Sequence, residues 1–202
     1  MSASTRSNLF DQLSQDITVK DILIDVGCGR LHDLIDFEYS EFKTLKGLDR
    51  NLYQPFRDYR RIKNLEHTPE LHRHFIKRFL LRKIDFREYD FGSEQFSLII
   101  CKHVLHFYSD NEKLAYLELF YNAMQSGGLL FIKMNHNKNV DNTDLQHMEQ
   151  IERTVYRNKT NLDDVRYLID ADSFLNSVKE KYSLLENHTI VDDKAVSFVI
   201  RK

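Results

Sequence analysis

The stretch Ile22-Leu-Ile-Asp-Val-Gly-Cys-Gly-Arg-Leu31 decides the fold class of this chain. Its apolar start is typical of a buried parallel strand, and Gly27 and Gly29 allow a ligand to approach the backbone where the strand ends. A second apolar run ends in Gly47-Leu-Asp-Arg50, which places Asp49 20 positions beyond Gly29. A carboxylate at this distance is positioned to accept hydrogen bonds from ribose hydroxyls. Together the two runs predict a nucleoside cofactor at the edge of a parallel sheet.

Asp25 distinguishes between two kinds of nucleoside cofactor. A dinucleotide would place its pyrophosphate at the glycine turn, where this carboxylate repels it. In addition, His32 occupies the position of the third glycine of the dinucleotide fingerprint. A cofactor that carries ammonium and sulfonium charges is instead attracted by Asp25. The turn therefore disfavours a dinucleotide and favours a cationic nucleoside.

The segment Asp25-Val-Gly-Cys-Gly-Arg-Leu31 resembles the first motif of the class I S-adenosylmethionine-dependent methyltransferases. That motif is an acidic residue followed by three glycines at every second position, and Leu31 stands where the last glycine is expected. The resemblance implies an α/β fold, a single Rossmann-like doubly wound domain. Its sheet would be seven-stranded and mostly parallel, with a C-terminal antiparallel strand. The resemblance also implies S-adenosyl-L-methionine as cofactor and S-adenosyl-L-homocysteine as product.

Length and composition limit the class of protein. A chain of 202 residues with 42% hydrophobic and 30% charged residues is expected to form one soluble domain with a continuous core. The apolar runs are far shorter than the ~20 residues of a membrane span. The N-terminus lacks the apolar centre of a secretory signal, so we expect no membrane partner and a cytoplasmic location. Cys28 and Cys101 fit no metal-ligand spacing, so we predict no metal site. The oligomeric state stays open.

Strand-like and helix-like segments alternate along the chain, as they do in a parallel sheet covered on both faces. The predicted strands are 21–26, 44–49, 82–86, 96–102 and 128–134, and the predicted helices are 31–38, 68–81 and 110–125. Thr68-Pro69-Glu70 predicts a helix start, and Ser109-Asp-Asn-Glu112 is a capping box. Gly127-Gly128 predicts a left-handed stop for the last of these helices.

The C-terminal part departs from this alternation. A helix predicted at 171–181 is followed by strand patterns at 183–191 and 195–201, joined by Asp192-Asp-Lys194. This turn is short enough for a hairpin, so we expect the last strand to run antiparallel. A terminal hairpin of this kind also resembles the methyltransferase fold.

Two further segments of the single domain 1–202 are expected to cover its site. Residues 1–20 are polar and predict a short N-terminal lid. Residues 135–165 form an insertion, which in the resembled family often covers the acceptor site. Within it we predict a helix that begins at Asp144 and aligns three apolar side chains on one face, those of Leu145, Met148 and Val155.

The resemblance assigns the cofactor contacts residue by residue. Asp49 is expected to bind the ribose hydroxyls, each bond contributing ~1.5–3 kcal/mol because one partner is charged. Asp85 stands where the family recognises the adenine amino group, with Asp90 as the alternative, and Phe86 is placed to pack on the purine. The predicted cofactor-binding residues are Asp25, Gly27, Cys28, Gly29, Asp49, Arg50, Asp85, Phe86, Cys101 and Lys102. For the two cysteines, a buried hydrophobic role and a redox pair are the alternatives.

The segment Phe96–Tyr108 resembles the fourth motif of the family, which faces the methyl group and the acceptor. It lacks the Asn-Pro-Pro-Tyr or Asp-Pro-Pro-Tyr element of enzymes that methylate bases or glutamine, and its Val-Leu-His-Phe part resembles small-molecule and tellurite-resistance-type methyltransferases. His103 is the candidate catalytic base, because it titrates near neutrality, and a plain surface role is the alternative. The predicted substrate-binding residues are His106, Asn135 and His136, with Tyr156 and Tyr167 as further lining candidates. For His106, a packing or hydrogen-bonding role is the alternative.

Three functions remain open. The favoured one is an enzyme, an S-adenosylmethionine-dependent methyltransferase that acts on a small-molecule acceptor by direct methyl displacement. The second is an RNA or protein methyltransferase that uses the locally basic segment 57–87, for which a solvated helix face is the simpler explanation. The third is a non-catalytic protein of the cofactor-binding fold, suggested by Leu31 in place of glycine.

Overall fold

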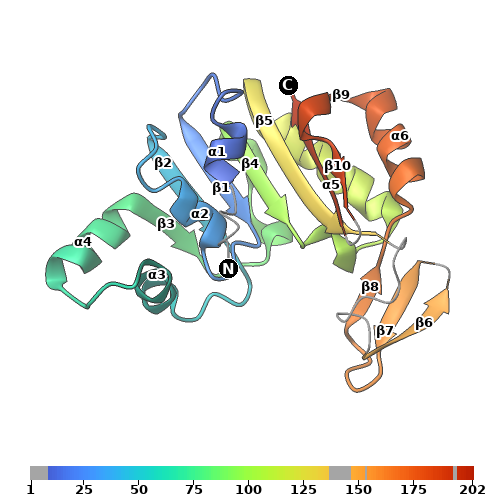
Figure 1. Ribbon diagram of the computed structural model, residues 1–202, viewed down its shortest axis with the longest axis horizontal. Helices are drawn as coiled ribbons and strands as arrows, with labels where there is room; N and C mark the ends of the chain where they lie inside the picture. Colours follow the sequence, from blue (N-terminus) through green and yellow to red (C-terminus); the bar gives the residue numbers. More distant parts are fainter. Residues whose placement is uncertain (1–8, 137–146, 153, 193–194) are drawn as a thin grey trace, which may run out of the picture.

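The computed structural model describes residues 9–136, 147–152, 154–192 and 195–202. A twisted sheet forms the centre, helices cover both of its faces, and a small second sheet projects from one end of the molecule (Figure 1). The strands are β1 Ile22–Val26, β2 Thr44–Leu48, β3 Phe79–Arg82, β4 Phe96–Lys102, β5 Met124–Asn135, β6 Met148–Glu152, β7 Val155–Asn158, β8 Val165–Tyr167, β9 Ser183–Leu184, β10 Ile190–Val191 and β11 Ala195–Arg201.

The helices alternate with these strands along the chain. They are α1 Leu9–Leu13, α2 His32–Asp36, α3 Pro55–Lys63, α4 Pro69–Arg78, α5 Asp110–Ala123 and α6 Ala171–Lys181, with short 3₁₀ turns η1 Phe86–Glu88, η2 Phe91–Ser93, η3 Leu105–Phe107 and η5 Glu186–His188. No helix among the described residues is long and apolar enough to cross a bilayer.

The central sheet has the strand order β10-β11-β5-β4-β1-β2-β3, and β9 also pairs with β11. The first five strands of the chain run parallel to one another, and β11 is antiparallel to β5, to β9 and to β10. This is the predicted α/β fold with a C-terminal antiparallel strand. The strand count is eight instead of seven, because the predicted strand 183–191 is divided by η5 into β9 and β10.

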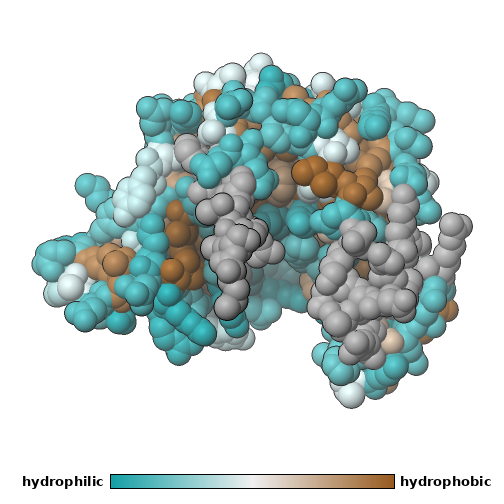
Figure 2. All heavy atoms as spheres, viewed as in Figure 1, coloured by the Kyte–Doolittle hydropathy of each residue, from teal (hydrophilic) through white to brown (hydrophobic). Residues whose placement is uncertain are grey.

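Two hydrophobic clusters lie on opposite faces of the sheet. Successive residues of β1 alternate between them: Leu23 belongs to one and Ile24 to the other, and both are fully buried. Helices α5 and α6 cover the face of Ile24, while α1, α2 and aromatic residues of α3 and α4 cover the face of Leu23. Burial on both faces explains the continuous apolar runs in the sequence. In the view of Figure 2 the outer surface is mostly hydrophilic, with a small hydrophobic patch over β10, whose Ile190 is 54% exposed.

The helix around residue 70 starts as predicted but ends earlier. The Thr68 hydroxyl accepts a hydrogen bond from the Leu71 amide at 3.1 Å, and Pro69 occupies the first turn. At the other end, the Arg78 guanidinium donates to carbonyls of the α2–β2 loop, among them Phe42 O at 2.7 Å. This anchor ends the helix, so the strand predicted at 82–86 is instead β3 at Phe79–Arg82.

The helix predicted at 110–125 starts as expected but ends earlier. The Glu112 carboxylate accepts from the Ser109 amide at 2.9 Å, which agrees with the capping box. However, α5 ends at Ala123 and not at the glycine pair. Gly127, with φ +77°, lies inside β5 and donates its amide to Lys202 O at 2.9 Å. This glycine therefore shapes an irregular strand. Helix α3 was not predicted, although Pro55 in its first turn was a usable signal.

The predicted helix of the insertion is wrong. Met148 and Val155 lie in strands of the three-stranded antiparallel sheet β6-β7-β8, while Asp144 and Leu145 lie outside the described residues. Met148, Tyr156 and Leu168 form a small core of their own. Met148 and Val155 are in paired strands, so the helical spacing of apolar residues in this segment does not reflect a helix. Of the predicted lid, the described part packs on the main body, where Leu13 is fully buried.

Candidate functional site

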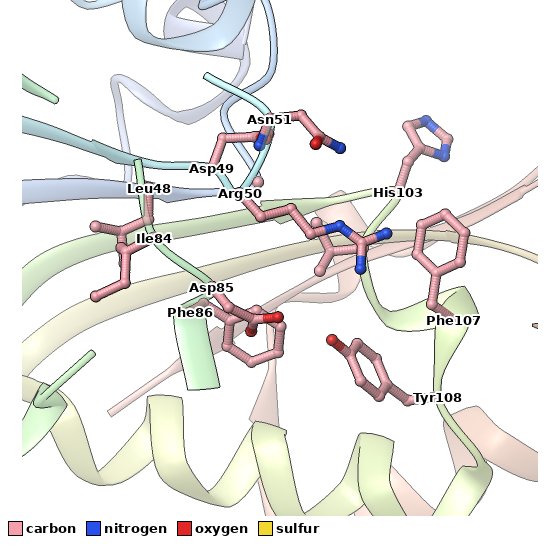
Figure 3. A pocket seen from close by; sticks show the side chains of 12 residues that line it. Leu48, Asp49, Arg50, Asn51, Ile84, Asp85, Phe86, His103, Phe107 and Tyr108 are labelled. Carbon is pink, nitrogen blue, oxygen red and sulfur yellow. The ribbon is translucent and has the colours of Figure 1, made fainter. Parts of the chain in front are cut away.

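A cavity of about 200 Å³ lies at the carboxyl ends of β1, β2 and β4. From β1 the chain continues through β2 and β3 to one side of the sheet, and then resumes with β4 on the other side of β1. Open α/β sheets bind ligands at such a reversal of strand order. Figure 3 shows the side chains that converge on the cavity from the three strand ends. Its lining consists of Gly27, Leu48, Asp49, Arg50, Asn51, Ile84, Asp85, Phe86, His103, Val104, Phe107 and Tyr108.

The glycine turn forms one wall because it can carry no side chain there. Gly27 has φ +76°, and a Cβ on it would lie 2.2 Å from Cγ2 of Val104. Gly29 also has a positive φ, +47°. The amides of Gly27 and Cys28 both donate to Leu48 O, at 2.8 and 3.0 Å, which fixes the turn against β2. The turn therefore offers bare backbone to a ligand.

Leu31 occupies the third glycine position of the motif and keeps the conformation of a glycine. Its φ is 67° and its ψ is 13°, in the left-handed region just before α2. This conformation costs a side-chain-bearing residue roughly 1–2 kcal/mol. The Leu31 side chain is fully buried, and burial of a leucine contributes about 1.5–3 kcal/mol. Packing thus offsets the backbone strain, and the turn keeps the shape that the motif requires.

Asp25 is a buried carboxyl group at the end of β1. It is 2% exposed, and its Oδ2 atom has no hydrogen-bond partner within the part of the chain that the structure describes. Burial, and then the neighbouring charge of Asp33, raise its pKa well above the ordinary range. A buried oxygen without a partner is costly, so a cationic ligand at the glycine turn would satisfy it.

Asp49 connects β2 to the glycine turn. Its Oδ2 accepts from the Gly29 amide at 2.8 Å, and its Oδ1 accepts from the Asn51 amide at 2.6 Å. An ionised carboxylate offers about four acceptor positions, so about two remain for hydroxyl donors. Asp49 thus holds the turn and faces the cavity at the same time.

Asp85 and Phe86 form the wall that continues from β3. Asp85 follows the strand by three residues, begins η1 and forms an ion pair with Arg87, with Oδ2 and Nη2 2.7 Å apart. The hydrogen bonds from Arg87 hold the pKa of Asp85 below its ordinary value. Phe86 is 6% exposed and packs edge-on against Tyr108, with ring centroids 5.7 Å apart.

His103 stands at the end of β4, in a strained backbone conformation. Its φ is 56°, and its amide donates to Lys133 O at 2.8 Å. The His103 side chain is exposed, yet partial desolvation by its neighbours, followed by the charges of Lys133 and Lys102, lowers its pKa below the ordinary value. The imidazole is therefore neutral at pH 7 and able to accept a proton. The Asn135 side chain partly opposes this lowering of the pKa.

His106 and His136 are buried, at 5% and 3% exposure, and lie outside the cavity lining. Burial first, then the charge of Arg166, lowers the pKa of His106 to about 3. Its Nδ1 atom has no partner among the described residues, and its ring packs on Phe107. The Nε2 atom of His136 lies 2.7 Å from Asp192 O.

Phe107 connects the cavity to the small sheet. The guanidinium of Arg50 lies 5.8 Å from its ring centroid, and that of Arg166, from β8, lies at the same distance. Arg50 comes from the loop after β2 and reaches into the cavity (Figure 3). The ring of Phe107 therefore contacts one cation from the loop after β2 and one from the small sheet.

The cavity brings together six residues of the predicted site, namely Gly27, Asp49, Arg50, Asp85, Phe86 and His103. The other predicted cofactor residues, Asp25, Cys28, Gly29, Cys101 and Lys102, lie outside its lining. Lys102 pairs with Asp33, with Nζ and Oδ1 2.5 Å apart. Cys28 and Cys101 are buried free thiols in different hydrophobic clusters, and burial raises the pKa of each. Asp90 also lies outside the lining, where it accepts from the Gly92 amide.

Sequence reasoning missed six lining residues, which are Leu48, Asn51, Ile84, Val104, Phe107 and Tyr108. Each is a sequence neighbour of a predicted site residue or lies in the same loop. Asn51 and Ile84, for example, stand within two residues of Asp49 and Asp85. Adjacency in loops at the carboxyl ends of parallel strands was the signal that could have identified them.

The strand order, the glycine turn and the acids after β2 and β3 define the class I S-adenosylmethionine-dependent methyltransferase fold. A family model described as a methyltransferase domain matches residues 5–180. The chain belongs to this family, whose methyl donor is S-adenosylmethionine. No curated protein matches the chain in a sequence search.

Solved structures share the fold at low sequence identity. An S-adenosylmethionine-dependent methyltransferase from Clostridium acetobutylicum has a TM-score of 0.68 and 12% identity, covering 96% of this chain and 88% of that one. The 1,6-didemethyltoxoflavin-N1-methyltransferase of Burkholderia thailandensis, bound to 1,6-didemethyltoxoflavin and S-adenosylhomocysteine, has a TM-score of 0.63 and 13% identity, covering 95% and 75%. Magnesium protoporphyrin IX methyltransferase of Synechocystis, with bound S-adenosylhomocysteine, reaches 0.59 and 14%, covering 95% and 79%.

Proposed function

We propose that this protein transfers the methyl group of S-adenosyl-L-methionine to a small-molecule acceptor by direct displacement. The observation that carries the proposal is that Asp49 and Asp85 line one glycine-walled cavity, while the buried Asp25, with its unpartnered Oδ2, stands at the end of β1 just before the glycine turn. The structurally similar proteins named above include enzymes of toxoflavin and porphyrin methylation, which supports a small acceptor.

Each of the three carboxylates has its own task in this proposal. Asp25, with its unpartnered Oδ2, attracts the cationic end of the cofactor beneath the glycine turn. Asp49 accepts hydrogen bonds from the ribose hydroxyls, and Asp85 accepts one from the adenine amino group. The bound cofactor supplies an activated sulfonium methyl group, so the protein contributes mainly alignment and exclusion of water.

His103 is the proposed base. Its neutral imidazole accepts the proton that an acceptor hydroxyl or amine loses as it is methylated. A His103→Gln variant should keep its affinity for S-adenosylhomocysteine and lose about 100-fold in methyl transfer to an acceptor found by screening metabolite extracts. Equal rates in the two proteins would remove His103 from the mechanism. His106, Asn135 and His136 are the proposed acceptor-side residues.

Calorimetric titration with S-adenosylhomocysteine tests the proposal as a whole. We expect binding by the wild-type protein and a loss of roughly 10-fold or more in Asp49→Ala, because two charge-assisted hydrogen bonds disappear. Asp90→Ala is the matched control, since this aspartate also accepts a backbone amide two residues on but lies outside the cavity. Absence of binding at millimolar ligand would support the non-catalytic alternative, and equal affinity in both variants would refute the ribose assignment.

One observation favours an RNA acceptor as the second candidate. Several cations of segment 57–87 are engaged, as in the pairs Lys63–Glu38 and Arg87–Asp85. In contrast, three arginines of α3, together with Asn64 and Leu65, line a second cavity of about 250 Å³; these are Arg57, Arg60 and Arg61. Guanidinium groups bind phosphate well.

The two candidates differ in their response to salt. If RNA is the acceptor, total RNA should be methylated and an oligoribonucleotide should bind with an affinity that falls steeply with salt. An Arg57→Gln/Arg61→Gln double variant should then lose affinity, while the control Arg73→Gln, which removes an exposed pair with Glu70, should not. Methylation of a metabolite fraction alone, with no RNA binding, would exclude this candidate.

A further inference from the structure

One residue, Arg87, donates three hydrogen bonds to the carboxylate of Asp85. Its amide and its Nε both donate to Oδ1, at 3.0 Å each, and its Nη2 donates to Oδ2 at 2.7 Å. This fork holds the carboxylate in one orientation and in its ionised form. The Asp85 side chain is only 15% exposed, whereas that of Arg87 is 52% exposed, so the acid faces inward and the arginine supports it from outside.

The three hydrogen bonds from Arg87 leave one acceptor position of the Asp85 carboxylate for another donor. A carboxylate offers about four acceptor positions, two on each oxygen. Arg87 uses both positions on Oδ1 and one on Oδ2. The position that remains on Oδ2 accepts an N–H or O–H donor, and an ionised carboxylate has no proton to offer a carbonyl oxygen.

Arg87 also supports a second wall of the cavity. Its guanidinium lies 5.7 Å from the ring centroid of Tyr108, which lines the cavity together with Asp85. Tyr108 in turn packs against Phe86 and Tyr116, with ring centroids 5.7 and 4.9 Å apart. In Figure 3 the Asp85 carboxylate and the Tyr108 hydroxyl point toward one another. The arginine therefore fixes a hydrogen-bonding edge and a neighbouring aromatic ring at once.

We propose that Arg87 is a positioning residue that makes this cavity select a 6-aminopurine over a 6-oxopurine. The inference rests on the proposed function, because it takes Asp85 as the residue that meets the purine edge. A 6-amino group donates to the free position on Oδ2, whereas a 6-oxo group brings an oxygen against the carboxylate in the orientation that Arg87 fixes. Selection therefore depends on the fork as much as on the acid.

The test compares S-adenosylhomocysteine with S-inosylhomocysteine, which differ in the group on C6 and in the proton that the 6-oxo form carries on N1. Calorimetry on the wild-type protein should give at least about a tenfold preference for the adenosyl ligand, because one charge-assisted bond is lost and a repulsion is added. In Arg87→Met the preference should fall to within about twofold. Arg87→Lys should recover part of it, because the charge remains while the fork is lost.

Two further measurements separate positioning from a general structural role. Arg82→Met is the control, since Arg82 lies over the ring of Tyr89 and outside the cavity lining, and it should leave the preference unchanged. In Arg87→Met the adenosyl ligand should also lose affinity at a higher pH on acidification, because the carboxyl group is no longer held ionised.

The outcomes distinguish this inference from the function on which it rests. Failure of the wild-type protein to bind S-adenosylhomocysteine would overturn the proposed function and the inference with it. Binding that shows no preference between the two ligands, or a preference that Arg87→Met leaves intact, would overturn the inference alone. A loss of both ligands in equal proportion would also overturn it, because it would assign Arg87 a structural role only.

Discussion

The proposed cofactor edge of the site (residues 25–31 and Asp49) and its proposed acceptor edge (residues 103–107 and Arg166) are built in different ways. At the cofactor edge, backbone amides hold the turn against β2: those of Gly27 and Cys28 donate to Leu48 O, and that of Gly29 donates to the Asp49 carboxylate. At the acceptor edge, side chains from distant segments meet, as when Arg50 and Arg166 both approach Phe107. The first edge depends on short-range contacts between two neighbouring strand ends, whereas the second forms only when β8 packs against η3.

The difference shows which kind of mutation each edge tolerates. A larger side chain at the cofactor edge would clash with packed atoms, so it should lower both the stability of the fold and the affinity for the cofactor. At the acceptor edge the sensitive property is charge, because the buried His106 stands near Arg166 and Lys113. Four predictions test this contrast.

The largest effect is expected for Gly27→Ala. The new Cβ would lie 2.2 Å from Val104 Cγ2, at a residue with φ +76°. Strain and overpacking should together lower the free energy of unfolding by about 2–4 kcal/mol and reduce binding of S-adenosylhomocysteine. Denaturant titration and calorimetry measure the two effects. Gly92→Ala is the control, because its Cβ would meet only an Asp90 oxygen, at 3.3 Å, and its φ is not in the left-handed region. Similar losses in both variants would contradict the prediction.

An intermediate effect is expected for the acid sensitivity of the acceptor edge. The folded protein holds the pKa of His106 at about 3, below the value of 6.5 for an unperturbed histidine. The unfolded chain therefore binds the proton first, and stability falls as the pH drops below 6.5. Between pH 6.5 and 5 this amounts to roughly 2 kcal/mol, which His106→Gln should abolish in denaturant titrations.

Asp25 at the cofactor edge should respond to pH in the opposite direction. Its pKa is raised in the folded state, so its contribution to stability is present at low pH and is lost as the pH rises through that value. Asp25→Asn should therefore stabilise the ligand-free protein at pH 7 and gain nothing at pH 4. If Asp25→Asn and His106→Gln changed the pH profile in the same direction, the contrast between the edges would be lost.

The smallest effect is expected for Leu31→Gly. The substitution relieves backbone strain of about 1–2 kcal/mol and gives up about 1.5–3 kcal/mol of burial, so the net loss should be near 1 kcal/mol. Because the turn keeps its conformation, the affinity for S-adenosylhomocysteine should stay within about twofold. Thermal unfolding and calorimetry on one preparation measure both quantities. A gain in affinity of tenfold would mean that the leucine distorts the turn.

The parts of the fold that follow from local patterns could be predicted from the sequence. The turn after β1, the position of Asp49 and the cap at Thr68 each depend on residues a few positions apart. The boundary between α4 and β3 could not be predicted, because the anchor of Arg78 lies some 40 residues earlier in the chain, at Glu38 O and Phe42 O.

The acceptor edge was out of reach for a related reason. Strand β7 pairs with β6 and β8, and the residues that bury its Tyr156 carry no helical or strand period that the sequence reveals. The neighbourhood of His106 likewise depends on Arg166, 60 positions later. A sequence pattern identifies a cofactor turn because the turn is local, and it leaves the acceptor side open because that side is assembled from separate segments.

The place of β11 between β5 and the short strands β9 and β10 has a consequence for synthesis of the protein on the ribosome. Strand β5 ends at Asn135 and its partner begins at Ala195, 60 residues later. At about 5–20 residues per second, the ribosome needs roughly 3–12 s to make the intervening chain. During that time the edge of β5, one of the longest and most buried strands, remains unpaired. The nascent chain is therefore open to mispairing with its neighbours until β11 has been made.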